Sequence, residues 1–148
     1  MVSVMGCDDC HSPKKMTDHG PEVDLEKRFS GYPAGRPFPK VDSNLIKNGM
    51  AVFTGDLQAA AGPWGVSFAA NISSDETGIG NWKFENFKKA LREGKTKGLD
   101  GARPILPPMP WQDFKNLTDD DIAAVFAFLK STKPISNVVP APKQLNEL

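Results

Sequence analysis

Two cysteines and a histidine near the start of the chain form the pattern with the clearest chemistry. The segment Cys7-Asp8-Asp9-Cys10-His11 has C-x-x-C-H spacing, and the sequence holds no other cysteines. One helical turn separates the two thiols, so both can add to the vinyl groups of one haem while the adjacent imidazole reaches the iron. The motif therefore predicts one haem c bound through thioethers to Cys7 and Cys10, with His11 as the proximal iron ligand.

Three other interpretations of this motif stay open. A thioredoxin-like redox pair needs a strand before the motif and a helix after it, whereas Pro13 and a polar, proline-rich segment follow here. A zinc site would have to add His19 to the motif, and a histidine directly after a ligating cysteine fits zinc spacing poorly. The third alternative is a simple disulfide between Cys7 and Cys10.

The sixth coordination position of such an iron decides between an electron carrier and a haem enzyme or sensor. Met109 lies within Leu106-Pro107-Pro108-Met109-Pro110-Trp111, where three prolines stiffen the loop that would present the thioether sulfur. The alternative is a methionine that merely fills a gap in an apolar loop. Met50 is expected in the core or in the haem wall, and His19 in solvent. Met109 is therefore the predicted distal ligand.

The composition is that of one folded domain. The chain has 148 residues, 39% of them apolar, and its 18 basic side chains balance 18 acidic ones. This balance gives no sign of a nucleic-acid partner. The longest apolar stretch, residues 122–129, is far shorter than the roughly 20 residues of a membrane-spanning helix. We therefore expect neither nucleic-acid binding nor a transmembrane segment.

Two helices are expected to position the site. Residues 84–92 carry apolar side chains at helical spacing and are followed by Gly94, a common helix end. Thr118 precedes three aspartates that favour the positive end of a helix, and residues 118–129 then present one apolar face. Both segments are predicted helices.

The remaining segments are rich in glycine and proline and are expected to be mostly ordered loops. Five prolines interrupt residues 12–42, which predicts a long surface loop. Residues 44–71 are expected to form a loose hairpin or extended loops.

These features together resemble bacterial class I c-type cytochromes. The resemblance rests on the C-x-x-C-H motif near the front, on Met109 in its proline-rich loop and on the helix start at residues 117–122. Further segments resemble the long-loop bacterial respiratory subgroup, namely residues 62–65, 71–75, 77–80 with Trp82, and 87–94. The resemblance implies a mainly α cytochrome c fold with long ordered loops around one covalent haem. It also implies Cys7 and Cys10 as thioether anchors, with His11 and Met109 as iron ligands.

The resemblance also implies a function. Such a domain carries single electrons between respiratory or other redox proteins and is not itself an enzyme. It works as a free carrier or as a subunit of a membrane respiratory complex, and the alternative is a haem enzyme or gas sensor with an open or labile sixth site. Because this haem is attached outside the cytoplasmic membrane, the protein is expected in the periplasm or facing it.

Two expectations concern the ends of the chain. Residues 1–136 are expected to form the cytochrome c domain, and residues 137–148 an extended C-terminal arm. The family usually has a whole amphipathic helix before the C-x-x-C-H motif, but only six residues precede it here. We therefore expect a truncated N-terminal helix in a chain read from an incomplete precursor. The alternative is that something else, such as a neighbouring subunit, covers the apolar face of residues 118–129.

Overall fold

A computed structural model describes residues 1–147 of the chain. Its helices are α1 (Cys7–His11), α2 (Ser43–Lys47), α3 (Phe84–Glu93), α4 (Trp111–Phe114) and α5 (Asp119–Lys130). Its strands are β1 (Lys14–Thr17), β2 (Gly20–Val23), β3 (Val52–Phe53), β4 (Ala59–Gly62) and β5 (Gly65–Phe68). Short 3-10 turns complete the elements at Leu25–Lys27, Thr96–Gly98 and Leu145–Glu147.

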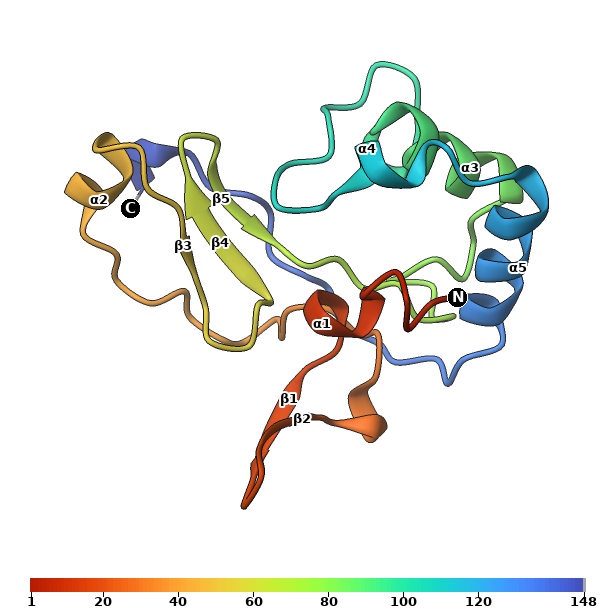
Figure 1. The fold of residues 1–148 in the computed structure, drawn as a ribbon, viewed down its shortest axis with the longest axis horizontal. Helices are drawn as coiled ribbons and strands as arrows, with labels where there is room; N and C mark the ends of the chain where they lie inside the picture. The colour runs from red at the N-terminus through yellow and green to blue at the C-terminus, as the bar shows by residue number, and fades with distance from the viewer. Residues whose placement is uncertain (148) are drawn as a thin grey trace.

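The expected mainly α fold class is wrong. Helices hold 31% of the residues and strands 14%, and the strands form two small antiparallel sheets. One sheet is the hairpin β1–β2, and the other has the strand order β3-β4-β5. Figure 1 shows the three-stranded sheet and α2 on one side, α3, α4 and α5 on the other, and α1 between them.

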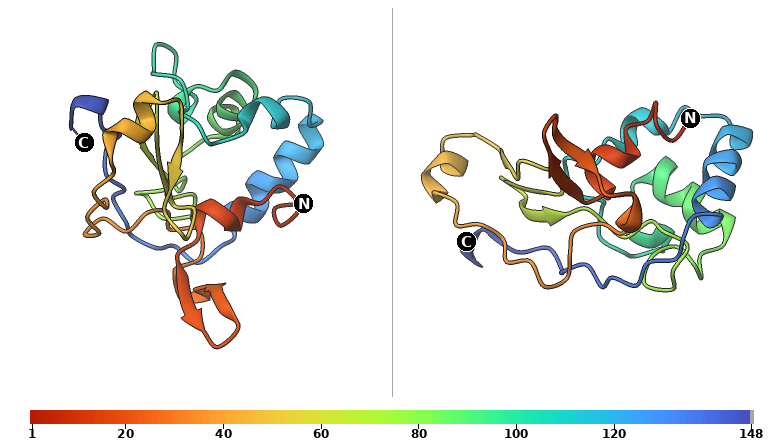
Figure 2. Two further views of the ribbon diagram at one scale, coloured as in Figure 1. Left: turned by 60° about the vertical axis from the view of Figure 1, so that its left-hand side comes forward. Right: turned by 90° about the horizontal axis from the view of Figure 1, so that it is seen from below.

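The hairpin lies inside the segment that was expected to be a loop, so that prediction is wrong in part. Gly20 adopts a left-handed φ of 108° that allows the tight turn after β1. Pro21 pairs with Met16 in a ribbon of only two strands, where a missing N–H donor is tolerated. The hairpin projects away from the body of the molecule in Figure 1 and in the left-hand view of Figure 2.

The loose hairpin expected within residues 44–71 is present as β4 and β5, but it belongs to a three-stranded sheet. The sheet itself was not predicted, because β4 and β5 do not alternate between buried and exposed residues. All four residues of β4 are buried, and so are the first three of β5. Small side chains suit this position, since Ala60 lies opposite Ser67 and Gly62 opposite Gly65. A strand buried on both faces lacks the period of two that marks a half-exposed strand.

Both predicted helices are confirmed as α3 and α5. Thr118 caps α5, and its hydroxyl accepts a hydrogen bond from the backbone N–H of Asp121. On the apolar face of α5, Ile122, Val125 and Leu129 are at most 2% exposed, and Phe126 is partly buried. The chain's own residues cover this face, including Val2, Phe29, Ile79, Phe87 and Leu91. The alternative that something else, such as a neighbouring subunit, covers this face is therefore wrong for these three residues.

The C-terminal segment leads from α5 back across the molecule to the three-stranded sheet (Figure 1). The side-chain amide of Asn137 donates to the carbonyl oxygens of Ser30 and Tyr32, at 2.6 and 2.9 Å. Further along, Lys143 pairs with Val66 of β5 through two backbone hydrogen bonds of 2.9 and 3.1 Å. The expected arm at residues 137–148 ends on Leu148, which lies outside the described residues. No helix within residues 1–147 has the length and apolarity needed to cross a bilayer.

Candidate haem-attachment site

The C-x-x-C-H motif folds into the single short helix α1. Cys7 and Cys10 are one helical turn apart, so their side chains lie on neighbouring positions of one face. Both thiols are free and partly buried, and Cys7 packs against the hydrophobic core. The structure therefore does not form the Cys7–Cys10 disulfide, and it leaves both sulfurs able to form a covalent bond.

The surroundings of the two thiols oppose the thioredoxin-like alternative. Burial, followed by the charge of Asp8, raises the pKa of Cys7 to about 11. Burial and then the charge of Asp9 also raise the pKa of Cys10. A redox-active cysteine needs a lowered pKa because the thiolate is the reacting form. These are protonated thiols at neutral pH, in a helix followed by a hairpin rather than in a βαβ unit.

Hydrogen bonds to both the backbone and the ring of His11 orient this residue. Its Nδ1 lies 2.7 Å from the carbonyl oxygen of Ala70, and its backbone carbonyl accepts a hydrogen bond of 2.8 Å from the N–H of Gly31. Because a carbonyl can only accept, Nδ1 carries the proton and the lone pair of Nε2 is free for a metal. Burial lowers the pKa of His11, although the Ala70 contact opposes this effect. The histidine therefore has the neutral form that ligates iron.

Asp8, a mere spacer in the C-x-x-C-H pattern, holds α1 in place. Arg28 donates to both of its carboxylate oxygens, from Nε at 2.8 Å and from Nη2 at 2.6 Å. Ser12 Oγ also donates to Asp8 Oδ1 at 2.8 Å, and accepts in turn from the backbone N–H of Phe29 at 3.0 Å. The hydrogen bond from Arg28 lowers the pKa of Asp8. The carboxylate thus ties the motif to the loop that contains Gly31.

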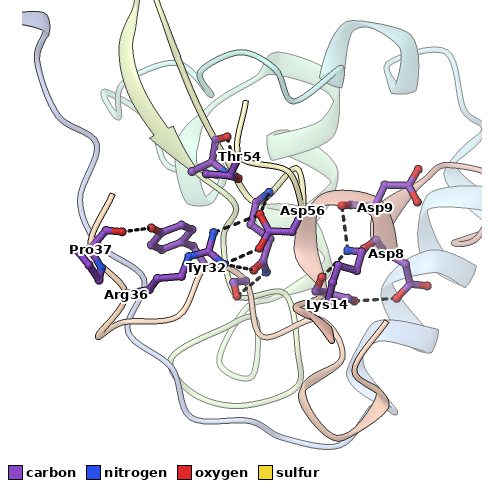
Figure 3. A network of polar contacts seen from close by, with 12 residues as sticks. Asp8, Asp9, Lys14, Tyr32, Arg36, Pro37, Thr54 and Asp56 are labelled. Carbon is purple, nitrogen blue, oxygen red and sulfur yellow. Dashed lines mark hydrogen bonds and ion pairs between the residues drawn. The ribbon is translucent and has the colours of Figure 1, made fainter. Parts of the chain in front are cut away.

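Lys14 closes the other end of the helix. Its Nζ donates to the carbonyl oxygens of Asp8, Asp9 and Ser12, at 2.9, 3.1 and 2.5 Å (Figure 3). A cation at this position donates to carbonyls near the C-terminal end of the helix and interacts favourably with the helix dipole. The motif helix is therefore capped by a residue outside the motif itself.

Met109 lies in a loop that other elements hold in place. Its side chain is partly buried and packs against the same core cluster as Cys7. Ser67 of β5 donates from Oγ to the carbonyl oxygen of Pro107 at 2.6 Å, which ties the loop to the three-stranded sheet. The structure therefore supplies a fixed support for this loop, and Met109 stays the predicted distal ligand.

The three tryptophans and Met50 have different surroundings. Trp64 donates from Nε1 to Ser67 Oγ at 3.3 Å, and Trp82 packs against the core. The ring of Trp111 occupies the space beside Gly94, where a Cβ atom would come within 2.3 Å of it. Met50 is 53% exposed, so it does not lie in the core, and its alternative place in the haem wall stays a prediction.

The donor set fits a haem c. Two free thiols one turn apart, an imidazole with a free Nε2 and a thioether in a supported loop are the groups that such a haem needs. His19 is exposed in the turn between β1 and β2. Within residues 1–147, no three His, Cys, Asp or Glu side chains form a group that could hold a metal ion by themselves. The alternative zinc site of Cys7, Cys10, His11 and His19 is therefore not formed.

Comparisons with known proteins agree with this chemistry. No protein-family model matches the chain. The cytochrome c subunit of a quinone-dependent alcohol dehydrogenase from Gluconobacter oxydans is 42% identical over 92 residues, which are 61% of this chain and 18% of that subunit. The fructose dehydrogenase cytochrome subunit of Gluconobacter japonicus is 38% identical over 87 residues, 57% of this chain and 17% of its own length.

A nicotinate dehydrogenase subunit of Pseudomonas putida is 41% identical over 80 residues, 53% of this chain and 6% of that protein. The matched segments span between 6% and 24% of the lengths of the curated relatives. Several of these relatives are cytochrome c subunits of dehydrogenases, which supports a c-type cytochrome with a role in electron transfer.

Proposed function

We propose that this chain is a monohaem c-type cytochrome that carries single electrons and does not itself catalyse a reaction on a substrate. The single observation that carries the proposal is the hydrogen bond from His11 Nδ1 to Ala70, beside two free thiols on the same helix. It leaves Nε2 as a ready iron ligand at the correct distance in sequence from both thioether anchors. Residues 1–136 are the electron-transfer domain in this proposal, and residues 137–148 are its arm.

The roles of the four site residues follow from their chemistry. Cys7 and Cys10 would hold the haem as thioethers, since addition of each thiol S–H across one vinyl group needs no oxidant. His11 would ligate the iron through Nε2, and Met109 through its thioether sulfur. The bound haem supplies an iron that exchanges one electron. A ligand loop stiffened by prolines and tied to Ser67 favours a stable sixth ligand over the open site of an enzyme or the labile site of a gas sensor.

The relatives suggest where the electrons come from. Their names describe cytochrome subunits of alcohol, fructose and gluconate dehydrogenases. We propose that this chain likewise accepts electrons from a dehydrogenase subunit and passes them to a respiratory acceptor. Because thioether attachment takes place outside the cytoplasmic membrane, the proposed location is the periplasm or the periplasmic face of the membrane.

The test is expression together with a haem-attachment system, followed by intact-mass and optical measurements. We expect the mass of one covalent haem, a c-type pyridine haemochrome and the weak near-infrared band of a sulfur-to-iron bond. Met109→Ala should lose that band, lower the potential and let carbon monoxide bind. The exposed Met50→Ala is the matched control and should keep the band. A wild-type protein without covalent haem contradicts the proposal, and a high-spin spectrum contradicts the assignment of Met109.

A further inference from the structure

Gln58, directly before β4, is a fully buried polar side chain that the haem chemistry does not use. Its exposed fraction is 0%. Its Nε2 donates to the carbonyl oxygen of Gly31 at 2.9 Å, and its own backbone carbonyl accepts from the N–H of Ala69 at 2.8 Å. A buried amide without partners costs about 1–3 kcal/mol, so this side chain needs the contacts that it makes. The side chain of Gln58 therefore holds the segment that contains Gly31, and its backbone holds the segment that contains Ala69.

These two segments are the ones that hold His11. Gly31 donates its N–H to the His11 carbonyl, and Ala70, next to Ala69, accepts the hydrogen bond from Nδ1. They also touch each other, because a Cβ atom on Gly31 would come within 2.5 Å of the carbonyl carbon of Ala70. Gln58 thus contacts both the segment that donates to the His11 backbone and the segment that accepts from its ring.

The amide oxygen and the backbone N–H of Gln58 also have partners. Its Oε1 lies 3.5 Å from Arg36 Nη1, and its backbone N–H donates to Asp56 Oδ1 at 3.2 Å. Arg36 itself donates to both carboxylate oxygens of Asp56, at 2.5 and 3.2 Å, and its guanidinium lies 4.2 Å from the centre of the Tyr32 ring (Figure 3). Since Arg36 can only donate and the Gly31 carbonyl can only accept, the orientation of the amide is fixed.

We propose that Gln58 is a positioning residue for the proximal imidazole and thereby sets the reduction potential of the haem. This inference rests on the proposed function, because it needs an iron on His11 Nε2. The hydrogen bond at Nδ1 makes the imidazole a more basic ligand, which favours the oxidised iron. Gln58 keeps the Ala70 carbonyl at bonding distance from Nδ1, so it holds the potential low.

The experiment compares haem-loaded wild type with Gln58→Met, which keeps the size of the side chain but removes its amide. We expect at least tenfold faster exchange of the Nδ1 proton in NMR spectra of the reduced protein. We also expect a higher reduction potential. At a fixed solution potential the ratio of reduced to oxidised protein should rise by up to tenfold, which corresponds to about 59 mV for one electron. Gln112→Met, at an exposed position of α4, is the matched control and should change neither quantity.

A second variant covers a failure of Gln58→Met to fold. Gln58→Asn keeps an amide for Arg36 but is one methylene too short to reach the Gly31 carbonyl, so it should shift both quantities in the same direction. Lower thermal stability with wild-type potential and wild-type Nδ1 exchange in the folded variant would show a merely structural role and overturn the inference. A wild-type protein without covalent haem would instead overturn the proposed function.

Discussion

The two sides of the proposed haem site are built in different ways. On the proximal side, His11 is held by Gly31 and Ala70, which are remote from it in the sequence. On the distal side, Met109 lies in a loop whose own prolines restrict the backbone, and one hydrogen bond from Ser67 anchors it. Long-range polar contacts therefore hold His11, whereas the stiffness of its own proline-rich loop mainly holds Met109. Substitutions on the proximal side should accordingly lower the free energy of unfolding more than those on the distal side.

The largest effect is expected at Gly31. Its φ is 74°, and a Cβ atom there would come within 2.5 Å of the Ala70 backbone. Gly31→Ala should therefore lower the free energy of unfolding by about 4 kcal/mol or more and leave little haem-loaded protein. Gly35→Ala is the control, because nothing lies within 4 Å of a Cβ at that position. Equal haem yields for the two variants would contradict the proximal half of the comparison.

The next largest effect is expected at the ion pair between Asp8 and Arg28, which holds α1 in place. Asp8→Asn removes the charge that accepts two hydrogen bonds from Arg28 in a partly buried pair. We expect a loss of about 2 kcal/mol in unfolding free energy, measured by denaturant titration. The neighbouring Asp9→Asn, at an exposed position, should change the stability little. An equal loss of unfolding free energy in Asp8→Asn and Asp9→Asn would contradict the proposed role of the Asp8–Arg28 pair.

The next prediction concerns the pH dependence of stability that arises from Asp56, which contacts Arg36 and the backbone of Gln58. Burial raises the pKa of Asp56, but hydrogen bonds from Arg36, Thr54 and the Gln58 backbone outweigh it and lower the pKa to about 2. Because the folded-state pKa lies below the ordinary 3.8, ionised Asp56 stabilises the fold above about pH 4 and this stabilisation is lost as the pH falls towards 2. The amount is roughly 2 kcal/mol at neutral pH.

Denaturant titrations of wild type and Asp56→Asn between about pH 6 and pH 3 check this prediction. The stability difference between the two proteins should shrink as the pH falls, since protonated Asp56 resembles the variant. Asp18→Asn, in the exposed turn of the hairpin, serves as the control. A difference that stays constant with pH would contradict the assigned role of the carboxylate.

The smallest effect is expected on the distal side. Ser67→Ala removes the hydrogen bond to the Pro107 carbonyl and should cost about 1 kcal/mol of stability. The prolines still restrict the loop, so we expect a weaker near-infrared band and slow binding of carbon monoxide rather than loss of the ligand. The exposed Ser3→Ala is the matched control. Complete loss of the band in Ser67→Ala would show that the loop is not stiff by itself.

Several features of the molecule could be predicted from the sequence because they depend on near neighbours in the chain. The C-x-x-C-H spacing spans one helical turn, so its chemistry can be recognised without a fold. The same holds for α3 and α5, where an apolar period and a cap at Thr118 are local signals. Residues 14–23 carry no such hairpin signal, because Pro21 is a poor strand residue everywhere except in a two-stranded or edge position.

What the tertiary structure alone decided is which residues surround the motif. Asp8, Gly31 and Gln58 carry no local pattern, and each acts through a partner that lies 20 or more residues away. A hydrogen bond between distant segments depends on how the whole chain packs, so no window of the sequence can reveal it. The sequence by itself determined the chemical groups that can bind a haem, while the packing of loops and sheets decided how the proximal histidine is oriented.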